Sequence, residues 1–271
     1  MLRIHDVRTG KSVEAAPARR GLTRVEAHTA GRDPSALRVL LVADILIRAL
    51  ELGGTPVWAV LNGDRRPELR AATAALGIRP FEDDGEAGAG LGEAQVIHVV
   101  GEGADTGERG TGPDTARPAS VTAGADAATK SPGGLRVSVA SVDTAGAGIV
   151  EGADGMPEGA DPAVVRLALL SRRRSVPVRL DAEALEEARD TLARWRRAVA
   201  GWARLPSRAV PEEVRTELRA AWEDDLDVPA VLRVLRRVET SDLPEGARFE
   251  TYAYADRLLG LELTRDLGAP A

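Results

Sequence analysis

The chain has 271 residues, with 42 acidic and 36 basic side chains and a net charge of −6. This length allows one large domain or two modest ones, and a hydrophobic share of 44% excludes a wholly disordered chain. The chain contains no cysteine, which excludes disulfides, thiolate metal sites and cysteine nucleophiles. The acidic balance argues against a general nucleic-acid-binding surface. Without a membrane-spanning apolar stretch or a signal pattern, we expect a cytoplasmic protein with no membrane partner.

Histidine and lysine are scarce. The three histidines, His5, His28 and His98, are too few to predict a histidine-rich metal site, so we expect no metal. His98 lies in an apolar segment and is interpreted as a hydrogen-bonded sheet residue. Lys11 and Lys130 are the only lysines, so any mechanism that needs a lysine has two candidates.

The first part of the chain alternates between strand and helix patterns. Residues 1–20 suggest a strand followed by a polar turn. Further on, the pattern predicts strands at 22–27 and 56–61, and helices from 35 to about 52 and from 67 to 76. This strand–helix–strand–helix order predicts a Rossmann-like α/β fold with a parallel sheet.

Ligands of parallel sheets usually bind beyond the carboxyl ends of the strands. In this chain those positions are the loops 28–35 and 62–66. Their polar residues are also ordinary turn formers, so a structural role is the alternative. The candidate binding residues are His28, Ser35, Asn62 and Asp64.

The middle of the chain is rich in glycine. Residues 81–160 hold 17 of the 28 glycines, and strand-like segments stand out only at 95–100 and 135–142. The composition of the remainder supplies few apolar anchors. We therefore expect flexible insertions at about 101–134 and 143–159.

The last part of the chain has helical periodicity. We expect a first domain over 1–160 and a helical bundle over 161–271, with Trp195 and Trp202 in its core. The five predicted helices begin near residues 161, 181, 211, 228 and 248.

Several stretches carry a family resemblance. Residues 161–170 read DPAVVRLALL, residues 222–230 read WEDDLDVPA, residues 43–48 read ADILIR, and residues 256–261 read DRLLGL. In this order and spacing they resemble cysteinyl-tRNA synthetases and the related cysteine ligase of mycothiol synthesis. The resemblance implies a class I synthetase fold, ATP as cofactor, and a zinc ion held largely by cysteines.

The chain departs from that family where the chemistry occurs. The histidine-containing HIGH motif falls at 33–36, where Asp33 stands and no histidine remains. The lysine-bearing KMSKS loop falls between 142 and 161, where there is no lysine or arginine. Such groups stabilise charge on the phosphates, and losing one typically costs about a hundredfold in rate. We therefore predict no catalytic residues and no zinc, although Arg32 or Arg38 could replace the phosphate contacts.

Two charged runs admit two interpretations each. The arginines at 172–174 could contact phosphate, or they could form a solvated helix end. The aspartates at 224, 225 and 227 resemble a family motif, with helix capping and solvent exposure as the alternative.

Three functions follow from these observations. The first is a catalytically degenerate relative of the family with a binding or regulatory role, whose partner is a small molecule or nucleotide at the sheet edge, or another protein. The second is an active ATP-dependent ligase with replaced motifs. The third is a purely structural helical module. The lost motifs favour the first over the second, and the strand–helix alternation favours it over the third.

Overall fold

The structure is a computed structural model. It describes residues 1–18, 21–29, 31, 33–63, 67–83, 93–103, 134–144, 152 and 155–268. Most of the two predicted flexible insertions, at 101–134 and 143–159, lies outside these residues.

In the described part of the chain, five strands form a parallel sheet in the order β5-β4-β3-β6-β7. Helix α1 (Pro34–Leu52) follows β3, and helix α2 (Pro67–Ala75) follows β4. The predicted strand–helix–strand–helix order and the α/β fold class are thereby confirmed. The five strands are β3 (Leu22–Thr29), β4 (Val57–Gly63), β5 (Glu82–Asp83), β6 (Glu93–Gly101) and β7 (Leu135–Val139).

The order of the strands reverses at the centre of the sheet. From β3 the chain passes through α1 to β4 on one side, whereas β6 pairs with β3 on the other side. A reversal of this kind leaves a crevice between the carboxyl ends of the two strands where the connections diverge, and ligands of parallel sheets usually bind there. A ligand site is therefore expected in the crevice between β3 and β6.

Three local predictions need correction. Asn62 and Gly63 were expected in a turn, but β4 continues through both because they pair with His28 and Thr29 of β3. The strand predicted within residues 1–20 is confirmed as β1 (Arg3–Asp6), but the polar stretch after it was predicted as a turn only and includes β2 (Lys11–Glu14), which pairs with β1 in antiparallel. The last helix begins earlier than residue 248, because Pro244 precedes its first turn.

The five predicted helices of the C-terminal part are confirmed. A two-residue strand, β9 (Val178–Arg179), pairs in parallel with β8 (Val142–Asp143) and joins this part to the end of the sheet. None of the helices in the described residues is long and apolar enough to cross a membrane. The five helices are α3 (Pro162–Leu170), α4 (Ala182–Trp202), α5 (Glu212–Glu223), α6 (Val228–Glu239) and α7 (Glu245–Leu259).

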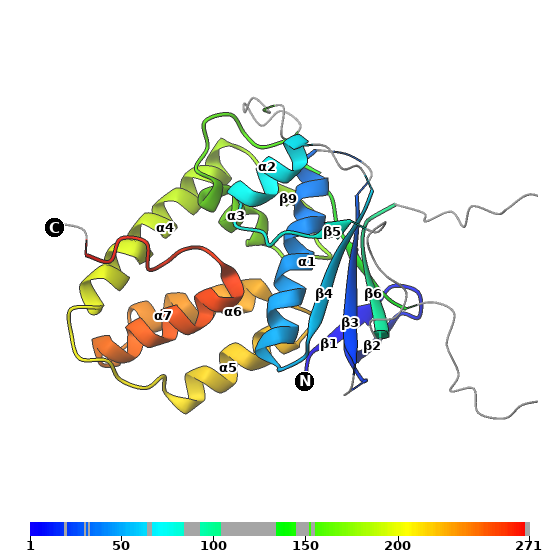
Figure 1. The fold of residues 1–271 in the computed structure, drawn as a ribbon. Coiled ribbons are helices and arrows are strands. Elements are labelled where there is room, and N and C mark those ends of the chain that lie inside the picture. Colours follow the sequence, from blue (N-terminus) through cyan, green and yellow to red (C-terminus); the bar gives the residue numbers. More distant parts are fainter. Residues whose placement is uncertain are drawn as a thin grey trace, which may run out of the picture.

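Helix α1 lies between the sheet and the C-terminal helices (Figure 1). Its apolar side chains are buried around most of its circumference, as expected for a helix covered on both sides. Buried side chains from the sheet, α1 and the C-terminal helices belong to one hydrophobic core, which includes Trp195 and Trp202 as predicted. The proposed domain boundary at residue 160 stays a prediction.

A buried ion pair crosses this core. Arg166 of α3 donates to Asp44 of α1 at 2.7 Å, and both side chains are fully buried. Arg166 also donates to the carbonyl oxygens of Leu76 and Leu259, at 2.9 and 2.6 Å. Leu259 is the last residue of α7. Gly260, which follows it, has a φ of 60°, and the Arg166 side chain packs against it. One arginine thus joins α1, the end of α2, and α7.

Candidate functional site

A cavity of about 330 Å³ lies at the carboxyl ends of β3 and β6, beside the beginning of α1. Its position matches the crevice that the reversal of strand order predicts. The residues that line it are His28, Thr29, Gly31, Asp33, Ser35, Ala36, Val39, Gly101, Glu102, Gly103, Val139 and Ser141.

The structure brings together two of the four predicted site residues. His28 and Ser35 both line the crevice. Asn62 is exposed on β4, next to His28 in the strand register, and does not line it. Asp64 lies outside the described residues. A binding role for these residues stays a prediction.

Hydroxyl groups are the neutral polar groups of the crevice. The Ser35 hydroxyl accepts a hydrogen bond from the backbone N–H of Val142 at 3.0 Å, and a hydroxyl that accepts can also donate its own proton. The Thr29 hydroxyl is buried and has no hydrogen-bond partner among the described residues. Because buried polar groups are nearly always paired, the Thr29 hydroxyl is available to a ligand in the crevice.

The charged groups of the crevice are acidic. Asp33 caps α1, because its carboxylate accepts a hydrogen bond from the backbone N–H of Ala36 at 2.8 Å. A helix beginning of this kind can bind phosphate, but here a carboxylate already occupies it. Glu102 adds a second carboxylate, and the described lining includes no lysine or arginine. Both carboxylates repel a triphosphate.

Arg38 does not replace the missing phosphate contacts. Its side chain is buried, and its guanidinium donates to the carbonyl oxygens of Ala140 and Val176 at 2.8 Å and of Arg173 at 2.9 Å. Burial lowers the pKa of Arg38 to about 10. The expectation that Arg38 could contact phosphate is therefore wrong, because the side chain is buried and both of its terminal nitrogens donate to backbone carbonyls. Arg32, the other candidate, lies outside the described residues.

A cluster of three titratable side chains adjoins the crevice. Nε2 of His28 lies 3.0 Å from Nδ1 of His98. Oε2 of Glu26 lies 3.0 Å from the same His98 nitrogen and 3.4 Å from Nε2 of His28. Glu26 and His28 point to one face of β3 because alternate residues share a face, and Glu26 is the register partner of His98 on β6. The prediction that His98 is a hydrogen-bonded sheet residue is confirmed, and its partners, Glu26 and His28, are themselves titratable.

Glu26 is held in its charged form. Burial alone would raise its pKa, but hydrogen bonds from His28 and His98 and the positive charge of Arg24 outweigh burial and hold the pKa well below its usual range. Nη2 of Arg24 lies 2.7 Å from Oε1, the other oxygen of this carboxylate. The Oε2 atom is thus turned toward the two histidines.

Glu26 and the pairing of His28 with His98 were not predicted. The signal in the sequence is an acidic residue and a histidine two positions apart on one strand, with a second histidine on another strand. Only the strand register shows that they meet. The zinc site implied by the family resemblance uses cysteine thiolates, which this chain does not contain. The donors in this cluster are nitrogen and oxygen instead.

The two charged runs have structural roles. Arg173 forms an ion pair with Asp227, and Asp227 caps α6 by accepting from the backbone N–H of Ala230 at 3.0 Å. Arg174 forms an ion pair with Asp225, which also accepts a hydrogen bond from the backbone N–H of His5. These contacts fasten α6 and the N-terminal hairpin to the end of α3. Asp227 thus caps a helix, as the second interpretation of the aspartate run predicts, whereas the buried Arg174 shows that the arginine run is not a solvated helix end.

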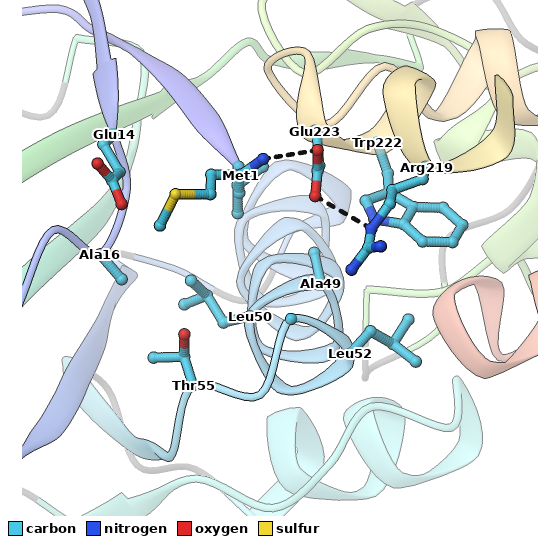
Figure 2. Close-up of a pocket in the computed structure, with 12 residues that line it drawn as sticks. Met1, Glu14, Ala16, Ala49, Leu50, Leu52, Thr55, Arg219, Trp222 and Glu223 are labelled. Carbon is cyan, nitrogen blue, oxygen red and sulfur yellow. Dashed lines mark hydrogen bonds and ion pairs between the residues drawn. The ribbon is translucent and has the colours of Figure 1, made fainter. Parts of the chain in front are cut away.

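A second cavity, of about 340 Å³, lies at the other end of α1 (Figure 2). Leu50 and Trp222 supply part of its apolar wall. Its Glu223 carboxylate contacts the Met1 amino group at 2.7 Å and Arg219 at 3.3 Å. This cavity lies away from the carboxyl ends of the parallel strands, where ligands of such sheets usually bind, so we place the candidate site at the crevice.

Comparison with known proteins gives a partial match. No protein-family model matches the chain. A stretch of 111 residues is 39% identical to the L-cysteine:1D-myo-inositol 2-amino-2-deoxy-alpha-D-glucopyranoside ligase of Streptomyces griseus, covering 39% of this chain and 26% of that relative. The ligase of the same name from Streptosporangium roseum is 38% identical over 109 residues, which is 38% of this chain and 26% of the relative.

The match spans about a quarter of the length of each of these relatives. Over that stretch it confirms the resemblance to the mycothiol cysteine ligases that the sequence motifs predicted. The activity in the relatives' name belongs to much longer proteins, so it enters only as a proposal for this chain.

Proposed function

We propose that this chain is a catalytically degenerate relative of the mycothiol cysteine ligases, a pseudoenzyme that binds a small neutral or cationic ligand in the crevice and does not activate ATP. The observation that carries the proposal is the charge of the crevice. Asp33 and Glu102 line it, and no lysine or arginine does so in the described part of the chain. A partner protein at the same edge of the sheet is the second kind of ligand that the proposal allows.

The positions of the remaining groups support this proposal. Adenylation develops negative charge on the phosphates, and an enzyme stabilises that charge with cationic groups or N–H donors aimed at it. At the beginning of α1 the carboxylate of Asp33 accepts the Ala36 N–H, which would otherwise be available to a phosphate. The guanidinium of Arg38 is bonded to backbone carbonyls. The hydroxyls of Thr29 and Ser35 can each donate a hydrogen bond to a neutral ligand or accept one from it.

The name of the relatives favours the alternative function. Their name says ligase, and an active ligase with replaced motifs would keep that activity. Such a ligase would need its cationic groups from outside the described residues, where Arg32 and Lys130 lie, or from a partner chain. The two functions differ in whether the purified chain activates cysteine.

Cysteine-dependent exchange of pyrophosphate into ATP is the experiment that separates them. We expect the purified chain to show exchange at the level of a sample without protein. Several charge-stabilising groups are missing, and the loss of even one typically costs about a hundredfold or more. These losses do not simply add, so the expected outcome is background exchange and not a calculated residual rate.

The matched variant for this assay is Ser35→Ala, which changes the crevice without changing its charge. Exchange that requires cysteine, exceeds the protein-free sample and falls in Ser35→Ala would contradict the proposal and restore the ligase. Exchange unchanged in Ser35→Ala would point to a contaminating synthetase, and immunodepletion of the chain then decides which protein is active.

A further inference from the structure

The Glu26–His28–His98 cluster presents three donor atoms to one point in space. The atoms are Oε2 of Glu26, Nε2 of His28 and Nδ1 of His98, and their mutual distances are 3.0, 3.0 and 3.4 Å. Glu26 is buried, and the two histidines are partly buried. Burial removes water from these polar groups, so each of them needs a hydrogen-bond or metal partner within the protein.

Hydrogen bonds alone cannot satisfy all three contacts. The carboxylate oxygen carries no proton, so only the two ring nitrogens can donate. If both nitrogens carry a proton, Glu26 accepts twice, but the two N–H groups then face each other across 3.0 Å. If only one nitrogen carries a proton, the lone pair of the other nitrogen faces the carboxylate oxygen, and these two atoms repel each other. A cation at the centre is attracted by all three atoms.

The spacing of the atoms matches metal coordination. Ligand atoms around a tetrahedral zinc ion lie about 3.3 Å apart, because zinc–nitrogen and zinc–oxygen bonds are about 2.0–2.1 Å long. The observed distances of 3.0–3.4 Å bracket that value. Arg24 contacts Oε1 of Glu26 at 2.7 Å and so fixes the direction of the carboxylate, the role that an outer partner of a metal ligand usually plays.

We propose that Glu26, His28 and His98 form a binding site for one zinc-class divalent metal ion, with two imidazole nitrogens and one carboxylate oxygen as ligands. Imidazole ligands suit zinc, whereas magnesium and calcium take oxygen ligands. Three protein ligands leave a further coordination position for water or a small ligand, as in sites where zinc binds substrate. His28 also lines the crevice, so that position adjoins the candidate binding site.

The test is a zinc titration of the tag-free full chain after removal of metals with a chelator. We expect one zinc ion per chain by calorimetry, competition with a chromophoric chelator, and a rise of the thermal unfolding midpoint with zinc. Glu26→Gln and His98→Gln are each expected to weaken zinc binding by at least about a hundredfold, the upper end of the range for loss of an outer partner. An excess of magnesium is expected not to compete.

His5→Gln is the matched control. His5 is exposed in the N-terminal hairpin, so its variant is expected to bind zinc as tightly as the unmodified chain. Circular dichroism without metal shows whether each variant is folded. His28→Gln is a third ligand variant, which replaces Glu26→Gln or His98→Gln if either does not fold. The absence of saturable zinc binding would overturn the proposal, and so would zinc binding that survives every ligand variant. Because ATP takes no part in the titration, neither result bears on the proposed function.

Discussion

Replacing Asp44 with asparagine is expected to lower the free energy of unfolding by about 3–5 kcal/mol, because it leaves a buried guanidinium without its counter-charge. Arg166 lies 2.7 Å from this carboxylate, and both side chains are fully buried. Burial lowers the pKa of Arg166, and Asp44 opposes that effect. Arg48 contacts the same carboxylate oxygen at 2.9 Å. Urea unfolding of Asp44→Asn beside the unmodified chain measures the loss.

Glu217→Gln is the matched control for Asp44→Asn, because it removes a carboxylate from an ion pair that is largely exposed. Glu217 of α5 pairs with Arg237 of α6, and both side chains are about half exposed. Pairs of this kind contribute about 0–1 kcal/mol. If Asp44→Asn costs no more than Glu217→Gln, the buried ion pair does not hold the two parts of the chain together.

A double variant shows whether the loss comes from the unpaired charge. Asp44→Asn combined with Arg166→Met removes both charges, so its loss is expected to be smaller than the sum of the two single losses. Some loss remains, because the carbonyl oxygens of Leu76 and Leu259 lose their donor. Losses that simply add would show that Asp44 and Arg166 act independently.

Replacing Arg38 with methionine is expected to have the next largest effect, a loss of about 3 kcal/mol or more. The carbonyl oxygens of Ala140, Arg173 and Val176 would each lose a donor, and an unpaired buried polar group costs about 1–3 kcal/mol. These carbonyls lie beyond β7 and α3, so Arg38 fastens α1 to both segments. Denaturant unfolding measures the loss.

Arg38→Lys separates charge from geometry. Lysine keeps the positive charge but cannot reproduce the fork of donors, so its stability is expected to fall between those of Arg38→Met and the unmodified chain. A chain whose stability is unchanged in both variants would contradict the structural role of Arg38. It would also return Arg38 to the candidates for phosphate binding and remove one support of the proposed function.

The elements that local pattern determines were predictable. The helix at Pro34–Leu52 follows from an aspartate cap, an early proline and the two glycines after its end, and the structure shows the Asp33 cap. The five C-terminal helices follow from apolar spacing, and the beginnings of α3 and α5 follow also from the prolines at 162 and 211. Two of the crevice residues, His28 and Ser35, follow from their positions after a strand and at a helix start.

What depends on contacts between distant segments was not predictable. The strands β5, β8 and β9 have two residues each, too few for a periodic signal. The meeting of Glu26 with His98 depends on the register of β3 against β6, which no local pattern specifies. Arg38 was predicted as a possible phosphate contact, because the carbonyl oxygens that it binds belong to residues more than 100 positions away in the sequence.

Equilibrium binding of ATP tests the central claim most directly. In a titration of the metal-free chain with ATP and magnesium, the acidic crevice predicts no saturable binding up to about 1 mM, which corresponds to a binding free energy weaker than about −4 kcal/mol. The variant Ser35→Ala, which alters the crevice but not its charge, is expected to behave in the same way. Saturable binding below about 0.1 mM that Ser35→Ala weakens would contradict the claim, because it would show that the crevice holds a triphosphate.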